Sequence, residues 1–285
     1  MRFVNFRTNG RHGTALQHKD GTLVGCFADE SQYPGSIAEL IAHGALPQAA
    51  RRLAQGTPLD ASRIEFLPPL TAPGKIVCLG LNYQDHAAEA GFNLPEYPSL
   101  FVRFASTLIG HEAPLVCPRV STHFDYEGEL AAVIGRAGRH IAAADALDHV
   151  CGYAVFNDAS VRDYQMKTSQ WTAGKNFDAT GPFGPALVTV DELPRGAAGL
   201  KLETRLNGQV MQSASTSQMI FDVAATIVLL SEFMSLAPGD VLVMGTPSGV
   251  GFARKPPVFM KAGDLCEVEI EGIGLLRNRV VGEPG

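Results

Sequence analysis

Residues 124–134, FDYEGELAAVI, decide the fold and contain the first candidate site. Residues 130–134 are apolar without interruption, which is typical of a strand covered on both faces. Successive side chains of a strand point to opposite faces, so Glu127 and Glu129 share one face, together with Asp125. Carboxylates that lead into a buried strand require a positive partner. Oxygen ligands suit Mg²⁺ or Mn²⁺, so the stretch predicts a metal site; an acidic face exposed to water is the alternative.

Other strand-like segments surround this stretch, without regular helices between them. They include residues 75–79, 152–157, 241–244 and 265–270, most of them bounded by glycine or proline turns. Clustered strands of this kind predict an α+β fold with a mixed or antiparallel sheet, and they disfavour a doubly wound parallel sheet. One long, mostly apolar helix is predicted over residues 217–236.

The first part of the chain differs in character from the rest. Residues 1–70 predict two strands and two short helices, the first opened by a capping box of Ser36 and Glu39. They contain no cluster of residues with evident chemistry. A proline-rich connector at residues 67–74 follows. We therefore expect a small N-terminal α+β domain over 1–70 and a catalytic domain over 71–285.

Composition excludes several classes of protein. The 285 residues carry a formal charge of −6 and no basic cluster, so nucleic-acid binding is not expected. The mostly apolar stretch at residues 223–230, which includes Thr226, is too short to span a bilayer. The N-terminus lacks the apolar core of a signal peptide, so a cytoplasmic location is expected. Five scattered cysteines without a CxxC pair predict neither disulfides nor a zinc site.

A second group of polar residues follows the apolar strand at 152–157. The carboxylate of Asp158 can complete a three-acid metal site at the end of this strand. Arg162 and Gln165 are three residues apart and would share one side of a helical turn. Arginine offers a bidentate fork for a substrate carboxylate. The alternative is a helix capped by Asp158 with an arginine on the surface.

Two further patterns carry possible chemistry. His86 and Glu89 would be neighbours on a helix, where the carboxylate raises the basicity of the imidazole and prepares it to deprotonate water; a surface helix pair is the alternative. Lys175 lies among glycine and apolar residues and can stabilise an enolate oxygen, or it is an ordinary surface lysine. Residues 245–251, GTPSGVG, could bind an anion through backbone N–H groups, but a plain turn is the preferred interpretation.

In order and content, five segments together resemble the fumarylacetoacetate hydrolase superfamily. The segments are 75–89, 125–135, 152–165, 174–183 and 238–251. The resemblance covers essentially residues 70–281. It implies a mixed β-roll or β-sandwich catalytic core behind a small variable N-terminal domain. It also implies a homodimer with a Mg²⁺ or Mn²⁺ site.

The resemblance assigns a role to each candidate residue. The implied metal ligands are Glu127, Glu129 and Asp158. The implied catalytic residues are His86, Glu89 and Lys175. The implied substrate-binding residues are Tyr83, Arg103, Arg162, Gln165 and Thr246. Many relatives carry Phe-x-Lys-Pro where this chain has FVRF at residues 101–104, which leaves the identity of the substrate open.

Members of this family act on 2-oxo acids or 1,3-dicarbonyl compounds. We expect a metal-dependent hydrolase that cleaves a C–C bond of an acylpyruvate or related 2-oxo acid, in the catabolism of aromatic compounds. His86 would activate water, while the metal and Lys175 would stabilise the departing pyruvate enolate. The alternative is a lyase or isomerase using the same enolate: an oxaloacetate decarboxylase or tautomerase, or a hydroxymuconate-type isomerase. A non-catalytic module that binds cations or organic acids is a third possibility.

Overall fold

The computed structural model describes residues 1–85 and 96–284. The largest element formed by these residues is a twelve-stranded sheet. Ten of its strands follow one another, in spatial order, as β4 (Thr57–Leu59), β3 (Leu23–Phe27), β2 (Arg11–Gln17), β1 (Arg2–Thr8), β14 (Gly181–Thr189), β12 (Val150–Asn157), β11 (Gly128–Ile134), β17 (Val241–Val243), β6 (Ile76–Gly80) and β7 (Ser99–Val102). The other two, β5 (Glu65–Leu67) and β8 (Leu108–Ile109), pair with β1 and β14.

A five-stranded sheet and a two-stranded ribbon complete the strand structure of the described part of the chain. In spatial order the five strands are β16 (Gln209–Ser215), β15 (Lys201–Leu206), β18 (Leu265–Ile270), β19 (Gly274–Gly282) and β9 (Leu115–Cys117). The ribbon consists of β10 (Phe124–Asp125) and β13 (Ser160–Val161). The described α-helices are α1 (Ile37–Ala42), α2 (Leu46–Leu53), α4 (Arg162–Gln165), α5 (Thr172–Lys175) and α6 (Val223–Phe233). Most pairs are antiparallel, but β6 and β17 are parallel, so the predicted α+β fold with a mixed sheet is confirmed.

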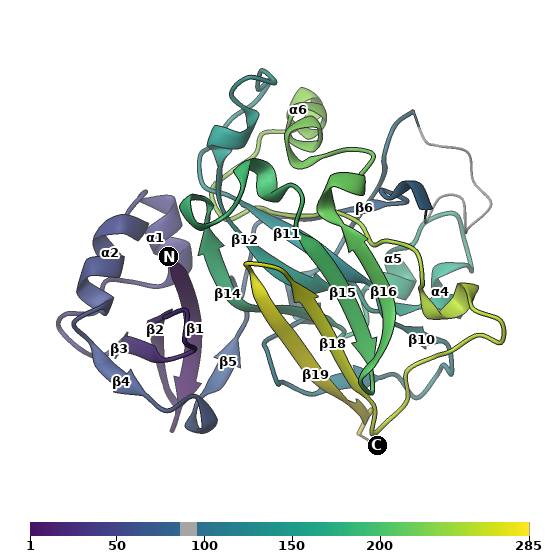
Figure 1. The fold of residues 1–285 in the computed structure, drawn as a ribbon, viewed down its shortest axis with the longest axis horizontal. Helices are drawn as coiled ribbons and strands as arrows, with labels where there is room; N and C mark the ends of the chain where they lie inside the picture. Colours follow the sequence, from purple (N-terminus) through teal and green to yellow (C-terminus); the bar gives the residue numbers. More distant parts are fainter. Residues whose placement is uncertain (86–95, 285) are drawn as a thin grey trace.

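The two sheets pack face to face around β11. Figure 1 shows β15, β18 and β19 crossing in front of β11 and β12. Leu130 and Ala132 of β11 share a buried cluster with Leu202 and Val268 of the five-stranded sheet. The intervening residues of β11 face a second buried cluster on the opposite side. Both faces of β11 are therefore covered, which explains its uninterrupted apolar sequence.

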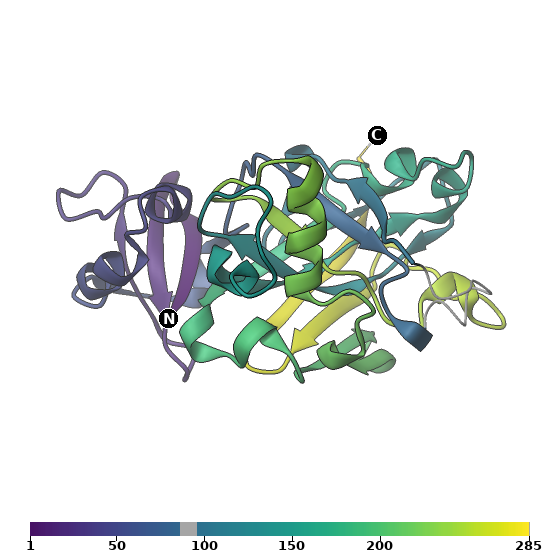
Figure 2. The same ribbon diagram turned by 90° about the horizontal axis from the view of Figure 1, so that it is seen from above.

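Residues 1–70 form a lobe at one end of the molecule (Figures 1 and 2). The predicted capping box is present, because Ser36 and Glu39 satisfy each other's backbone N–H groups at the start of α1. The lobe is joined to the rest by β1, which pairs with β14 and continues the large sheet. The domain boundary near residue 70 stays a prediction.

The long helix expected over residues 217–236 is shorter in the structure. Its helical part is α6, which lies at the top of the body in Figure 1. Asp222 caps this helix by accepting a hydrogen bond from the N–H of Ala225 at 2.8 Å, so the preceding residues take a separate turn. Within the described residues, the structure contains no helix with the length and apolarity needed to cross a membrane.

Candidate metal centre and active site

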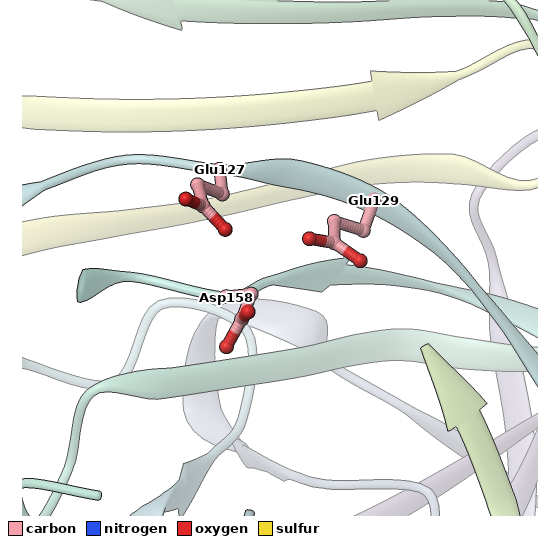
Figure 3. Close-up of side chains that lie close together, drawn as sticks. All are labelled: Glu127, Glu129 and Asp158. Carbon is pink, nitrogen blue, oxygen red and sulfur yellow. The ribbon is translucent and has the colours of Figure 1, made fainter. Parts of the chain in front are cut away.

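Three buried carboxylates meet at the start of β11 (Figure 3). Each of Glu127, Glu129 and Asp158 offers an oxygen, and the three oxygens lie within 4.8 Å of one another. The sheet register explains the meeting. Gly128 pairs with Asn157, and the N–H of Asp158 donates to the carbonyl oxygen of Glu127 at 2.9 Å. Asp158 therefore lies directly across the strand pair from Glu127.

Gly128 separates the two glutamates for a packing reason. It faces the five-stranded sheet, and a Cβ at this position would clash with Thr204 Oγ1 and Val268 Cγ1. Only glycine lets the two sheets approach this closely. The Glu-Gly-Glu sequence thus places the carboxylates on one face of the strand and keeps the opposite face flat.

Lys175, at the end of α5, supplies a positive charge to this acidic cluster. Its Nζ lies 2.6 Å from Glu127 Oε2 and 2.6 Å from Asp158 Oδ2, and the side chain is 2% exposed. Burial by itself would lower the pKa of Lys175, but the charges of Asp158 and Glu127 outweigh it and raise the pKa. The side chain is therefore an ammonium ion.

Glu129 has a different environment. Burial, together with the charges of Asp158 and Glu127, raises its pKa well above the usual range, and its described hydrogen-bond donor is the N–H of Gly245. Glu129 thus favours the protonated form when no divalent cation is bound. Three clustered oxygen donors with this excess of negative charge fit Mg²⁺ or Mn²⁺, with Glu127, Glu129 and Asp158 as the ligands.

Asp125 does not join the three acids, contrary to the expectation that it lies on their face. The strand is interrupted at residues 126–127, so Asp125 belongs to the β10–β13 ribbon instead of β11. There its Oδ2 accepts from Arg162 Nε at 2.8 Å. Arg162 also reaches Glu127 and donates from Nη1 to Gln165 Oε1 at 2.9 Å.

A cavity of about 120 Å³ opens beside this cluster. Its polar lining consists of Glu127, Glu129, Arg162, Gln165, Lys175 and Thr246, all predicted from the sequence as metal, catalytic or substrate-binding residues. Its apolar lining includes Leu79, Phe101, Met166, Trp171 and Phe252. The structure thus brings six of the predicted residues to one cavity, and their roles in binding and catalysis remain proposals.

The glycine-rich segment 245–251 contacts the acidic cluster in two ways: the N–H of Gly245 donates to Glu129, and Thr246 binds the backbone of Gly128. Thr246 Oγ1 donates to the carbonyl of Gly128 at 3.0 Å and accepts from Gln212 Nε2 at 2.8 Å. Gln212 Oε1 in turn accepts from the N–H of Gly128 at 3.0 Å. Gln212 was not predicted from the sequence, because no motif in β16 distinguishes it from an ordinary strand residue.

Two residues predicted to contact the substrate do not line this cavity. Tyr83 is 1% exposed and packs in the main core, beside Met219. Arg103 is buried behind Asp158, to which its Nη1 donates, while Nη2 donates to Thr180 Oγ1 at 2.8 Å. The buried charge of Asp158 draws the arginine away from the cavity. Arg103 therefore supports a proposed metal ligand, and its contact with the substrate stays a prediction.

His86 and Glu89, the predicted water-activating pair, lie outside the described residues. Their proposed role stays a prediction from sequence.

The buried pair of Arg103 and Asp158 predicts a large effect on stability. Removing one partner of a buried ion pair costs about 3–5 kcal/mol, because the other charge is left uncompensated. We expect Arg103→Met to lower the free energy of unfolding toward the lower end of this range, because Lys175 still pairs with Asp158, and Arg103→Lys to lower it less. Urea denaturation of the metal-free protein measures both. Arg119→Met is the control, since Arg119 is exposed; equal losses for Arg103→Met and this control would contradict the prediction.

The fold and the site together define a class of enzyme. The fold is a mixed β-sandwich, and its buried acids are suited to a divalent cation. A small cavity beside them is lined by a lysine and an arginine. The chain belongs to the fumarylacetoacetate hydrolase family, because the family described as "Fumarylacetoacetate (FAA) hydrolase C-terminal" matches residues 75–281. The resemblance stated from the sequence is thereby confirmed.

Individual relatives span nearly the whole chain. The chain is 42% identical to the human protein named "Oxaloacetate tautomerase FAHD2A, mitochondrial" over 289 aligned residues, covering 99% of this chain and 92% of the human one. Among solved structures, it matches a fumarylacetoacetate hydrolase from Exiguobacterium antarcticum with a TM-score of 0.87 and 35% identity, covering 99% and 100% of the two chains. It matches 5-carboxymethyl-2-hydroxymuconate delta-isomerase from Mycobacterium smegmatis with a TM-score of 0.78 and 31% identity, covering 100% of both.

Proposed function

We propose that this protein is a divalent-metal-dependent tautomerase of oxaloacetate or of a closely related 2-oxo diacid. The observation that carries the proposal is 42% identity to an oxaloacetate tautomerase across 99% of this chain. The site supports it, since Lys175 and Arg162 both line a cavity of about 120 Å³. Pockets for drug-sized ligands measure roughly 300–1,000 Å³, so this cavity favours a compact acid.

The formal charge of the site favours an anionic substrate. Among the described residues of the site, four buried acids and three buried cations leave a formal charge of −1. These residues are Asp125, Glu127, Glu129, Asp158, Arg103, Arg162 and Lys175. A divalent cation would make the formal charge of the site positive, and a dianionic substrate would then return this charge to −1. A neutral ligand would leave an uncompensated positive charge in a buried site.

Tautomerisation moves one proton and breaks no carbon–carbon bond. The proton leaves C3 of the 2-oxo acid, its electron pair forms the C2=C3 double bond, and a proton is added to the C2 oxygen. A bound divalent ion would supply polarisation of the C2 carbonyl. The ammonium of Lys175 stabilises negative charge that develops at this oxygen, and Arg162 binds the second carboxylate.

The proton acceptor at C3 is assigned to His86, oriented by Glu89, as the sequence pattern suggests. This assignment differs from the hydrolytic one, in which His86 activates water. The names of the curated relatives favour the tautomerase alternative over the hydrolysis of acylpyruvates that we first expected. The hydroxymuconate isomerase among the similar structures also fits a proton-transfer reaction better than hydrolysis.

The proposed activity can be tested with Mg²⁺-loaded protein and oxaloacetate. We expect the protein to accelerate the interconversion of keto and enol forms, measured by the ultraviolet absorbance of the enol, without producing pyruvate. His86→Ala should slow this interconversion by about 100-fold or more, because general acid–base catalysis contributes that much. Pyruvate formation at the same rate would instead identify a decarboxylase. Cleavage of acylpyruvates without any tautomerase activity would instead support the interpretation of the protein as a hydrolase.

The expected homodimer and cytoplasmic location remain predictions, and the human relative is named as a mitochondrial protein. For the dimer contact we propose the edge of the large sheet at β7, where no further strand of the described residues pairs. Val102, Phe104 and Phe233 are exposed there beside an apolar groove of about 520 Å³. Light scattering of the purified protein measures the oligomeric state, and a monomer would contradict this proposal.

A further inference from the structure

The carboxylate of Asp125 joins three separate segments of the chain. It is fully buried and accepts hydrogen bonds at both oxygens. Oδ1 accepts from the N–H groups of Tyr126 and Gly251, at 2.9 and 2.8 Å. Oδ2 accepts from Phe252 N–H at 3.0 Å and from Arg162 Nε at 2.8 Å. One side chain thus fixes the relative positions of β10, the 251–252 turn and the arginine that lines the cavity.

The turn at residues 251–252 is built closely against this carboxylate. A Cβ at Gly251 would clash with Asp125 Oδ1 and with the carbonyl of Val258. Phe252 then places its ring 4.6 Å from the guanidinium carbon of Arg162 and lines the same cavity. Asp125 therefore holds Arg162 directly and also holds the aromatic ring that covers it.

These contacts leave one nitrogen of the Arg162 guanidinium without a hydrogen-bond acceptor among the described residues. Nε is bound by Asp125, and Nη1 is bound by Gln165 and Glu127. Nη2 is buried and has no hydrogen-bond partner within the described part of the chain. Arginine has five N–H donors in a rigid fork, so a guanidinium held at Nε and Nη1 presents the donors of Nη2 in a fixed direction. A buried donor without a partner is costly unless a ligand completes it.

We propose that Asp125 is a positioning residue that sets substrate selectivity: it fixes Arg162 so that Nη2 receives the second carboxylate of the substrate. This inference rests on the proposed function, because it concerns a 2-oxo acid with two carboxylates. Without the charge of Asp125, the nearest remaining anion for Arg162 is Glu127. The guanidinium then turns toward the three-acid cluster, and Nη2 leaves the position that the carboxylate requires.

The test compares two stable ligands that differ only in the second carboxylate. Malate and lactate share a 2-hydroxy carboxylate group, and calorimetry with Mg²⁺-loaded protein measures the affinity of each. We expect the wild-type protein to prefer malate and Asp125→Asn to reduce that preference by about tenfold or more, since a hydrogen bond to a charged group contributes about that factor to an affinity. Lactate affinity should change little. The KM for oxaloacetate should rise more than kcat falls.

A double-mutant comparison separates positioning from general structural damage. Asp125→Asn should have little further effect on the malate preference when Arg162→Gln is already present, because Asp125 acts through Arg162. Asp240→Asn is the matched control, since Asp240 is also buried and bound to a cation and a backbone N–H, but lies away from the cavity. It should leave the preference unchanged.

Several results would overturn the inference. They are equal loss of malate and lactate affinity in Asp125→Asn, an effect of Asp125→Asn that persists in Arg162→Gln, or wild-type protein that binds malate no better than lactate. If Asp125→Asn does not fold, Arg162→Lys replaces it: lysine keeps the charge but lacks the fork, so retention of the malate preference would contradict positioning. Absence of tautomerase activity would reject the proposed function, while the binding ratio would still decide the role of Asp125.

Discussion

Glu129→Gln is expected to weaken binding of the divalent cation strongly while the fold is kept. Glutamine still offers an oxygen to the N–H of Gly245, so the local hydrogen bond survives. It cannot carry a negative charge, and the proposed site loses one of its three anionic ligands. Even residues that only orient a metal ligand contribute about 10–100-fold to affinity, so we expect a loss of at least about 100-fold. Tautomerase activity should fall by a similar factor.

The measurement is calorimetric titration of the metal-free protein with Mn²⁺ or Mg²⁺. The control is Glu203→Gln, because Glu203 is a partly buried glutamate that pairs with Lys201 and Arg205 away from the cavity. The control should bind the cation as the wild-type protein does. Unchanged affinity in Glu129→Gln would remove Glu129 from the metal site.

The raised pKa of Glu129 also predicts a dependence of cation binding on pH. Burial first, and then the charges of Asp158 and Glu127, raises this pKa in the folded, metal-free protein. Protonated Glu129 therefore stabilises the metal-free fold at low pH, and this contribution is lost as the pH rises through the raised pKa. The cation requires the carboxylate form, so its apparent affinity should increase with pH over the same interval. In Glu129→Gln this increase should largely disappear.

Lys175→Met should remove most of the activity and weaken the metal-free protein. The ammonium of Lys175 lies 2.6 Å from both Glu127 and Asp158, so methionine leaves two buried carboxylates without this partner. Loss of a preorganised charge that stabilises a developing oxyanion typically costs about 10²–10³ in kcat. We therefore expect kcat to fall by about this factor. The melting temperature should fall in the metal-free protein and recover when a divalent cation replaces the lost charge.

Lys167→Met provides the matched control for this substitution. Lys167 is an exposed lysine near the same site, whose Nζ lies 3.3 Å from the centre of the Tyr164 ring. It should change neither kcat nor the cation-dependent gain in melting temperature. A Lys175→Met protein that melts as the wild type does without metal would show that the lysine does not neutralise the acidic cluster.

Local patterns in the sequence predicted several features well. The two-residue spacing of Glu127 and Glu129 placed both side chains on one face, as the structure has them. The apolar residues 130–134 predicted a strand covered on both faces. Each of these features depends on the geometry of a strand over a few residues, which the alternation of side chains fixes without reference to the rest of the chain.

The same rule failed where the strand was interrupted. Extending the alternation back to Asp125 placed it with the other acids, but β11 begins only at Gly128 and residues 126–127 interrupt the strand. Asp125 consequently pairs with Arg162 in another ribbon. Arg103 was expected at the substrate and lies behind Asp158. In both cases the position of a charged side chain depends on the partner that neutralises it, and that partner is distant in sequence.

By itself, the sequence determined the family, the mixed α+β class and the residue types suited to a divalent cation and a carboxylate substrate. Only the tertiary structure decided which of these residues meet. The register between β11 and β12 sets Asp158 opposite Glu127, and the position of α5 brings Lys175 between them. The physical reason is that buried charges must be compensated, and compensation depends on distances across the fold that no local pattern encodes.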